Sequence, residues 1–206
     1  MTPTKRDQIL KMFHSTHVLR ARDFVRAGIV REHLSRLVEA GVLVRPGRGL
    51  YVLSDDEPTE HRSLVEATRL VPSGVVCLLS ALQFHELTTQ SPFEVWLAID
   101  HKTRMPKLES LSLRIMRFSG LALTSTIEEH ILEGACVRVY SAAKTVADCF
   151  KFRNKVGLDV AIEALRDCLR QKKANRDELW NAAKVCRMTN VMRPYMEANV
   201  EFMKSS

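Results

Sequence analysis

Polar and charged side chains that suit contact with DNA are concentrated between residues 31 and 48. A predicted helix carries Arg31, Glu32, Ser35 and Arg36, and the turn that follows it carries Arg45 and Arg48. Arginine pairs bidentately with guanine, and a glutamate accepts a hydrogen bond from the cytosine amino group, so the helix residues suit base-edge or phosphate contacts. The two turn arginines suit phosphates, which position a protein without specifying sequence. We predict that these six residues bind DNA.

The charge of the chain supports this site. Residues 1–54 hold ten Lys and Arg against four Asp and Glu, a net +6, whereas residues 55–206 hold 21 against 20, a net +1. Neutralising DNA phosphates releases condensed counterions, so a local basic excess is typical of a nucleic-acid-binding module. A solvated basic face with no partner remains the alternative.

The elements that would position these residues follow from the spacing of apolar residues. Thr4 is a candidate N-cap of a first helix that extends to about residue 13, and a short helix over 22–27 ends at Gly28. Four residues at helical spacing predict the buried face of a third helix that ends at Gly41: Val30, Leu34, Leu37 and Val38.

Two apolar runs, 42–44 and 50–53, flank the Pro/Gly turn at 45–49 and predict a β-hairpin. This is the element order of a winged helix-turn-helix: a helix, then two helices joined by a turn, then a hairpin with a basic tip. In that fold the second of the two joined helices enters the major groove. A winged helix used for protein contacts is the alternative.

The chain changes character at the acidic segment 55–57. Strands are expected at 75–77, 93–99, 111–118 and 137–140, and helices at 60–71, 80–87, 141–152, 160–169, 175–187 and 189–203. The expected fold class is α/β (α+β): an N-terminal winged helix-turn-helix over residues 1–55, then a mixed α/β domain over residues 56–206 with a helical C-terminal layer.

Two short patterns admit an enzymatic interpretation. Asp100-His101-Lys102 follows an apolar strand, as the acidic-x-Lys element of metal-dependent nucleases does, with Glu86 or Glu94 as the further ligand. Ser141 and Lys144 match the SxxK pattern of some acyl-transfer enzymes. We interpret Asp100 as a strand-end turn residue and Ser141 as a helix N-cap. Asp148, four residues after Lys144, predicts a surface ion pair.

No metal, cofactor or catalytic residue is predicted. The seven histidines have no metal-ligand spacing. The five cysteines contain no CxxC pair, so we expect each of them to be a reduced thiol that packs as a small apolar side chain. A basic cluster near the C-terminal end fits a solvated helix end, with a second nucleic-acid surface as the alternative. Its residues are Arg166, Arg170, Lys172, Lys173 and Arg176. No apolar stretch has the length of a membrane span or a secretory signal, which predicts a cytoplasmic protein with no membrane partner.

Three segments carry a resemblance to a known family. They are LVEAGVLV at 37–44 running into RGLYV at 48–52, SALQFHELT at 80–88, and YSAAKTVAD at 140–148. With these segments the chain resembles the AbiEi-type antitoxins of type IV toxin-antitoxin (abortive infection) systems over nearly its whole length. Val30 departs from the Ser or Thr with which such recognition helices often begin.

The resemblance implies a repressor that binds double-stranded DNA at inverted repeats in its own promoter through the N-terminal domain, and such repeats leave room for a dimer on the DNA. It also implies that the C-terminal domain opposes a nucleotidyltransferase toxin without a stable complex. Two other hypotheses stay open: a winged helix fused to a metal-dependent nuclease-like domain, and a regulator whose C-terminal domain senses a ligand or a partner.

Overall fold

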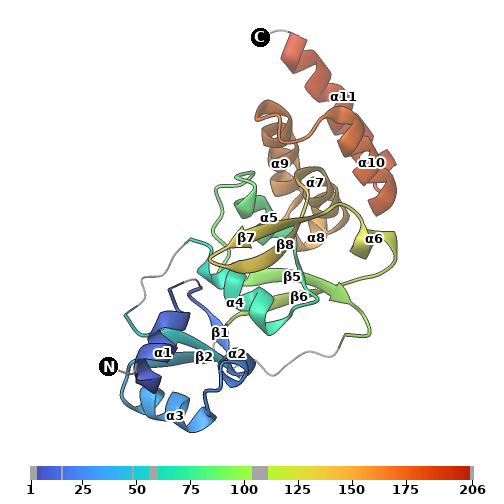
Figure 1. The fold of residues 1–206 in the computed structure, drawn as a ribbon. Coiled ribbons are helices and arrows are strands. Elements are labelled where there is room, and N and C mark those ends of the chain that lie inside the picture. The colour runs from blue at the N-terminus through green and yellow to red at the C-terminus, as the bar shows by residue number, and fades with distance from the viewer. Residues whose placement is uncertain (1–3, 15, 48, 56–59, 104–110, 205–206) are drawn as a thin grey trace. The chain divides into compact units, whose positions relative to one another are not determined.

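The chain is a mixed α/β protein, as the sequence predicted, and it forms two compact units (Figure 1). The structure is a computed structural model that describes residues 4–14, 16–47, 49–55, 60–103 and 111–204, with side chains as far as residue 198. Unit 1 comprises residues 1–74, 103–113 and 129–137. Unit 2 comprises residues 75–102, 114–128 and 138–206.

Unit 1 holds the helix-turn-helix and its hairpin. Its elements are α1 (Lys5–Met12), β1 (Leu19–Arg20), α2 (Ala21–Arg26), α3 (Arg31–Glu39), β2 (Leu43–Gly47), β3 (Leu50–Leu53) and α4 (Arg62–Leu70). The three strands form an antiparallel sheet in the order β1-β3-β2. The structure therefore contains the helices and the hairpin that the sequence predicted for a winged helix.

Local sequence explains where these helices begin and what holds them together. The Thr4 hydroxyl accepts from the backbone N–H of Asp7 at 3.1 Å, and the Asp7 carboxylate accepts from the backbone N–H of Thr4 at 3.0 Å, which completes a capping box on α1. Phe24 of α2 is fully buried, with its ring 5.9 Å from that of Phe13 and 5.7 Å from that of Tyr51. These rings join α1, α2 and β3 in one apolar core.

Helix α4 is attached to the helix-turn-helix. Arg69 of α4 donates a hydrogen bond to the Thr16 hydroxyl at 3.3 Å and lies 3.7 Å from the Asp23 carboxylate. Asp23 also accepts from the backbone N–H of Arg20 at the start of α2. The described part of unit 1 thus continues beyond residue 55, and a functional boundary at that residue remains a prediction.

The second sheet is mixed, with β4 at its centre. The sheet order is β6-β5-β4-β8-β7, with β4 antiparallel to β5 and parallel to β8. The strands are β4 (Val75–Val76), β5 (Val95–Asp100), β6 (Leu113–Phe118), β7 (Ile127–Leu132) and β8 (Ala135–Tyr140). The edge strand β7 was not predicted, because its residues are partly or fully exposed and its polar and apolar residues do not alternate.

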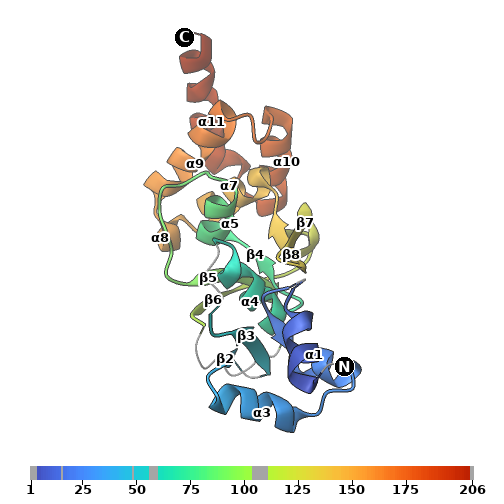
Figure 2. The ribbon, with the colours of Figure 1, turned by 60° about the vertical axis from the view of Figure 1, so that its left-hand side comes forward.

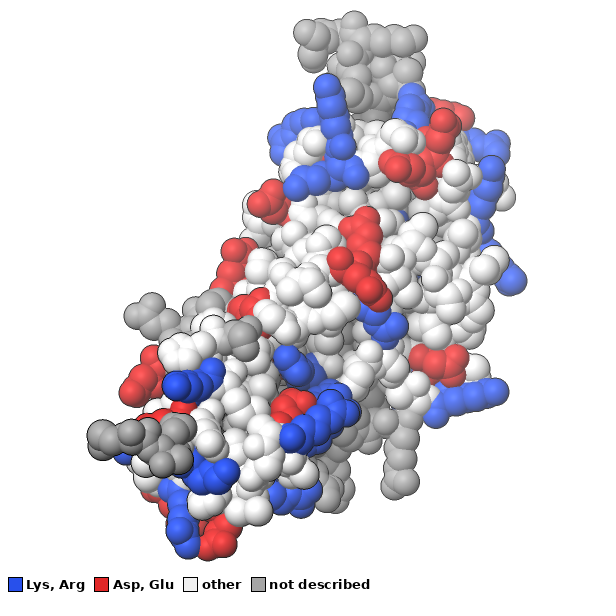
Figure 3. Space-filling view, in the orientation of Figure 1, with Lys and Arg blue, Asp and Glu red and all other residues white. Residues whose placement is uncertain are grey.

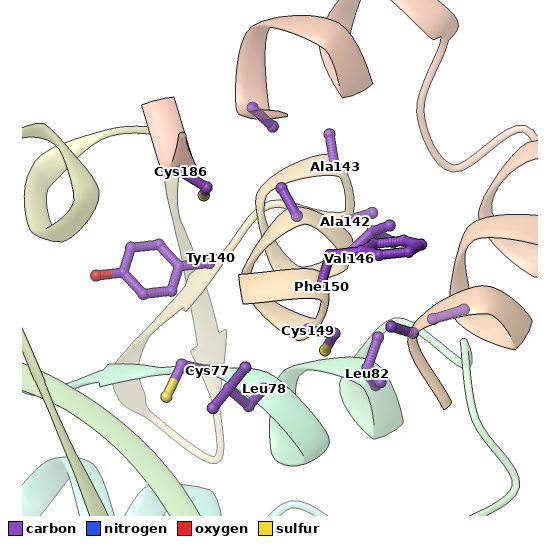
Figure 4. Packing of buried hydrophobic residues seen from close by; sticks show 14 of the residues in the cluster. Cys77, Leu78, Leu82, Tyr140, Ala142, Ala143, Val146, Cys149, Phe150 and Cys186 are labelled. Atoms are coloured by element: carbon purple, nitrogen blue, oxygen red, sulfur yellow. The ribbon is translucent and has the colours of Figure 1, made fainter. Parts of the chain in front are cut away.

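The helices of unit 2 are grouped around α7. They are α5 (Leu78–Phe84), α6 (Leu121–Thr124), α7 (Ala142–Lys151), α8 (Arg153–Val156), α9 (Leu158–Arg170), α10 (Arg176–Cys186) and α11 (Thr189–Lys204). Helix α7 packs against α5, α9 and α10. Figure 4 shows its Val146 and Phe150 among buried side chains that include Leu82 and Cys186. Every residue from Ala142 to Phe150 is buried, so this part of α7 has no solvent-facing side.

The burial of α7 contradicts one sequence interpretation. Lys144 and Asp148 were predicted to form a surface ion pair, but their side chains are 0 % and 1 % exposed. Lys144 Nζ donates to Asp148 Oδ2 at 2.5 Å, and the Cys186 thiol donates to Asp148 Oδ1 at 3.1 Å. The ammonium also lies 4.2 Å from the centre of the Tyr140 ring. The spacing was right, but it cannot show whether a helix face is solvated.

The five cysteines are free, and only Cys136 is exposed. Burial raises the pKa of Cys168 to about 11 and that of Cys186 to about 12, and it raises the pKa values of Cys77 and Cys149 well above the usual range. Because the thiolate is the reactive form, the native protein should show one rapidly reacting thiol at pH 8 and five in denaturant. Titration with a chromogenic disulfide reagent measures this, and Cys136→Ser should remove the rapid phase. Several rapid thiols in the native state would contradict the packing around α7.

No helix among the described residues has the length and hydropathy required to cross a membrane.

Candidate nucleic-acid interface

Helix α3 presents the four predicted DNA-contacting residues to solvent. Arg31, Glu32, Ser35 and Arg36 are all exposed. On the opposite side Leu34 is fully buried, and Leu37 and Val38 pack against the same core. The helix is therefore attached by one face and open on the other, as a helix that enters a DNA groove must be.

Two of these residues contact each other. Arg36 Nη2 donates to Glu32 Oε1 at 2.5 Å across one helical turn, and the two side chains are 69 % and 68 % exposed. An exposed i,i+4 pair contributes only about 0.3–0.5 kcal/mol, so DNA phosphates or bases can replace the carboxylate at small cost. In the structure Glu32 is therefore the ion-pair partner of Arg36.

The start of α3 differs from the sequence prediction. Val30 was placed on the buried face, but it is the N-cap residue, has extended backbone angles and is 57 % exposed. Its side chain cannot accept the hydrogen bond that a Ser or Thr cap would. The helical spacing misplaced Val30 because the residue before a helix does not follow the helical period.

The hairpin lies beside α3, and helix α3 packs against β2 (Figure 2). Strands β2 and β3 pair antiparallel, with a register shift between Val44 and Gly47. Arg45 is exposed within this irregular part of β2, while Gly47 is buried, and a Cβ there would lie 3.3 Å from Leu70. Arg48, the other predicted hairpin arginine, lies outside the described residues.

Charge alone does not outline the site. On the face of the molecule visible in Figure 3, Lys and Arg side chains are interspersed with Asp and Glu. The basic excess of residues 1–54 is a property of the segment as a whole. The candidate interface is therefore defined by the exposed face of α3 and the adjacent hairpin.

Comparison with known families tests this assignment. Residues 7–54 match the family of AbiEi antitoxin transcriptional regulators. The match runs from within α1 to the end of β3, through the elements that form the winged helix, and it confirms the resemblance predicted from the sequence over this AbiEi-type segment. No curated protein matches the chain.

The nuclease-like residues of the C-terminal part are not assembled into a metal site. Asp100 ends β5, and its Oδ1 accepts from the backbone N–H of Lys102 at 2.8 Å, which is a turn contact. Glu94 pairs with Arg114 at 3.6 Å and Glu86 with Lys173 at 3.2 Å. Within the described ranges no group of three or more His, Cys, Asp or Glu could hold a metal ion.

The other two sequence candidates have structural roles in the described contacts. Ser141 caps α7, since its hydroxyl accepts from the backbone N–H of Lys144 at 3.4 Å, while the Lys144 ammonium is bound to Asp148. In the basic segment 166–176, Arg170 pairs with Asp167 at 2.8 Å. Arg176 donates to the Met196 carbonyl at 3.1 Å. These contacts favour the interpretation of that segment as a solvated helix end.

Proposed function

We propose that the protein is a cytoplasmic transcriptional repressor and antitoxin of a type IV toxin-antitoxin system, with no catalytic activity. The winged helix binds inverted repeats in the protein's own promoter, with α3 in the major groove and two protomers on the DNA. The residues assigned to binding are Arg31, Glu32, Ser35, Arg36, Arg45 and Arg48. The domain over residues 56–206 counters a nucleotidyltransferase toxin without a stable complex.

One observation carries the DNA-binding part: the AbiEi-type segment coincides with a winged helix whose α3 exposes all four of its predicted contact residues. The burial of Leu34 fixes the opposite side of α3, so the exposed side chains can enter a groove without unfolding the helix. The exposed Arg45 on the hairpin supplies a phosphate contact beside it.

A mobility shift on the promoter DNA tests the repressor function. The full chain is titrated onto its own upstream promoter at several salt concentrations, with an unrelated duplex as competitor. Specific binding that weakens with salt is expected, because each neutralised phosphate contributes about 0.9 to the slope of log affinity against log salt. Equal affinity for promoter and competitor, or no binding at low salt, would overturn the proposal.

The antitoxin part needs a separate assay. Co-expression with the toxin encoded beside it should restore growth, and the Arg31→Ala, Arg36→Ala double variant should restore growth equally when it is expressed from an unrelated promoter. This follows because the proposal assigns DNA binding and toxin neutralisation to different residues. Loss of protection in this variant, at equal protein level, would contradict the division between residues 1–55 and 56–206.

The Glu32–Arg36 contact gives a further prediction. Glu32→Gln removes a negative charge that binds Arg36 at 2.5 Å, so affinity for unrelated duplex should rise by about three- to tenfold at low salt. Discrimination should fall by a similar factor if Glu32 accepts from cytosine in the bound state. Competition mobility shifts measure both quantities.

Glu39→Gln is the matched control, since Glu39 is also exposed and on α3 but lies at its C-terminal end. It makes the same change in net charge and should leave the ratio of specific to non-specific affinity unchanged. Equal effects of the two variants would show that Glu32 acts only through the overall charge of the domain.

A further inference from the structure

Four cations from three elements and an adjoining loop converge on one hollow of unit 2. The hollow has a volume of about 850 Å³ and lies between the end of β6, the start of α6 and the C-terminal ends of α7 and α10. Its basic lining residues are Arg117, Lys151, Lys184 and Arg187, and none of the described lining residues is acidic. Small-molecule sites have volumes of about 300–1,000 Å³, so this hollow is large enough for a ligand.

Helix capping explains part of this charge but not its convergence. Lys151 and Lys184 lie in the last turns of α7 and α10, and Arg187 is the C-cap of α10, where cations stabilise a helix. Arg117 comes from a strand, and its guanidinium donates to the Asp100 and His101 carbonyls at 2.9 and 3.1 Å. These two hydrogen bonds hold the guanidinium in place at the end of β6.

The floor of the hollow contains two aromatic rings, those of Phe118 and Phe152. The Phe118 and Phe152 rings are stacked, with centres 5.3 Å apart and planes 9° apart, and the Phe118 ring also stacks with that of the fully buried Tyr140, with centres 5.9 Å apart. The buried Lys144 ammonium lies 5.1 Å from the centre of the Phe118 ring. Met188 and Leu121 extend the apolar lining, and Leu121 is 71 % exposed at the rim.

We propose that this hollow binds a nucleoside phosphate. The four cations match the charge of a di- or triphosphate, because guanidinium and ammonium groups bind phosphate oxygens by charge-assisted hydrogen bonds. The apolar floor beside them suits the planar, weakly polar base. Neither inorganic phosphate alone nor an apolar molecule alone would use both parts of the lining.

Isothermal titration of the full chain with ATP tests the site. ATP is expected to bind, tripolyphosphate more weakly and adenosine most weakly. Lys184→Ala with Arg187→Ala should weaken ATP binding at least about tenfold, since two charge-assisted contacts are lost. Both side chains are exposed, so the fold should be retained. Lys155→Ala with Arg193→Ala removes the same charge from exposed positions outside the hollow and should leave ATP affinity unchanged.

A second variant tests the same hollow from its rim. Leu121→Glu places a carboxylate beside the phosphate site at a position exposed enough to tolerate it, and it should also weaken ATP binding about tenfold. The proposal is overturned if ATP does not bind at about 1 mM, the range of weak specific ligands. Equal effects of the two double variants would overturn it as well, as would tripolyphosphate binding as tightly as ATP. Promoter binding by the winged helix is a separate measurement, so failure here leaves the proposed function standing.

The exposure of Val30 carries a second inference, which rests on the proposed function. The apolar side chain at the N-cap of α3 is 57 % exposed and has no described cap or core contact to explain it. The N-terminal residues of a recognition helix contact base edges, and an apolar side chain there contacts the thymine methyl group. We infer that Val30 recognises a thymine in the promoter half-site.

Substituting deoxyuridine for thymidine tests this contact, because it removes only the methyl group. At one half-site position the wild-type affinity should fall about three- to tenfold, the loss expected for one apolar contact. The same substitution should have no effect on Val30→Ala. Val25→Ala, an equally exposed valine on α2, is the control and should remain sensitive to the substitution.

The outcomes separate the two levels of the proposal. If Val30→Ala keeps the wild-type sensitivity to deoxyuridine, the thymine contact is wrong while promoter binding stands. Absence of any sensitive position leads to the same conclusion. Absence of promoter binding by the wild-type protein would overturn the proposed function and this inference together.

Discussion

Replacing Arg31 and Arg36 together by alanine should abolish discrimination between promoter and unrelated duplex while the protein stays folded. Each arginine that pairs bidentately with a base contributes about 1–3 kcal/mol, so losing both should weaken specific binding by at least about 30-fold. Both side chains are exposed on α3, and the one described ion pair lost, Arg36 with Glu32, contributes little to stability. Competition mobility shifts measure the discrimination between the two duplexes, and a thermal unfolding curve shows whether the variant stays folded.

Two comparison variants distinguish sequence recognition from simple loss of charge. Lys5→Ala with Arg6→Ala removes two exposed cations from α1 and should leave the ratio of specific to non-specific affinity unchanged. Arg45→Ala should weaken binding to promoter and unrelated DNA alike and reduce the salt slope by about 0.9. If the Arg31, Arg36 variant also keeps its specificity ratio, α3 is not the recognition helix.

The winged helix was predictable from sequence because its signals are local. Thr4 with Asp7, Gly28 after α2, and the Pro/Gly turn between two apolar runs each specify an end or a turn within a few residues. Val30 shows the limit of this argument. Its spacing matches the helix period, but its backbone is extended, so its side chain does not join the face that contains Leu34.

The chain beyond residue 74 was less predictable because its determining features are not local. Strand β7 (IEEHIL) has no buried residue, and its polar residues are consecutive, so no apolar alternation marks it. The positive φ angles of Glu133 and Gly134 identify the turn into β8, but Glu-Gly is a weaker turn signal than Asn-Gly. The basic hollow joins residues near 117, 151 and 187, and nothing in their sequence spacing indicates that they meet.

The buried Lys144–Asp148 pair gives the largest expected effect on stability. Lys144→Met leaves the Asp148 carboxylate uncompensated in a site where burial raises its pKa, so unfolding free energy should fall by about 3–5 kcal/mol. Lys155→Met makes the same substitution at an exposed position and should change the unfolding free energy by less than about 0.5 kcal/mol. Urea unfolding followed by circular dichroism measures both.

The pair can also be removed as a unit. Lys144→Met with Asp148→Leu replaces two buried charges by apolar groups of similar size, and such replacements are often neutral or stabilising. The double variant should therefore be more stable than Lys144→Met alone, even though it also removes the acceptor of the Cys186 thiol. A double variant less stable than the single one would show that Asp148 stabilises α7 and α10 chiefly through Cys186, with the ion pair secondary.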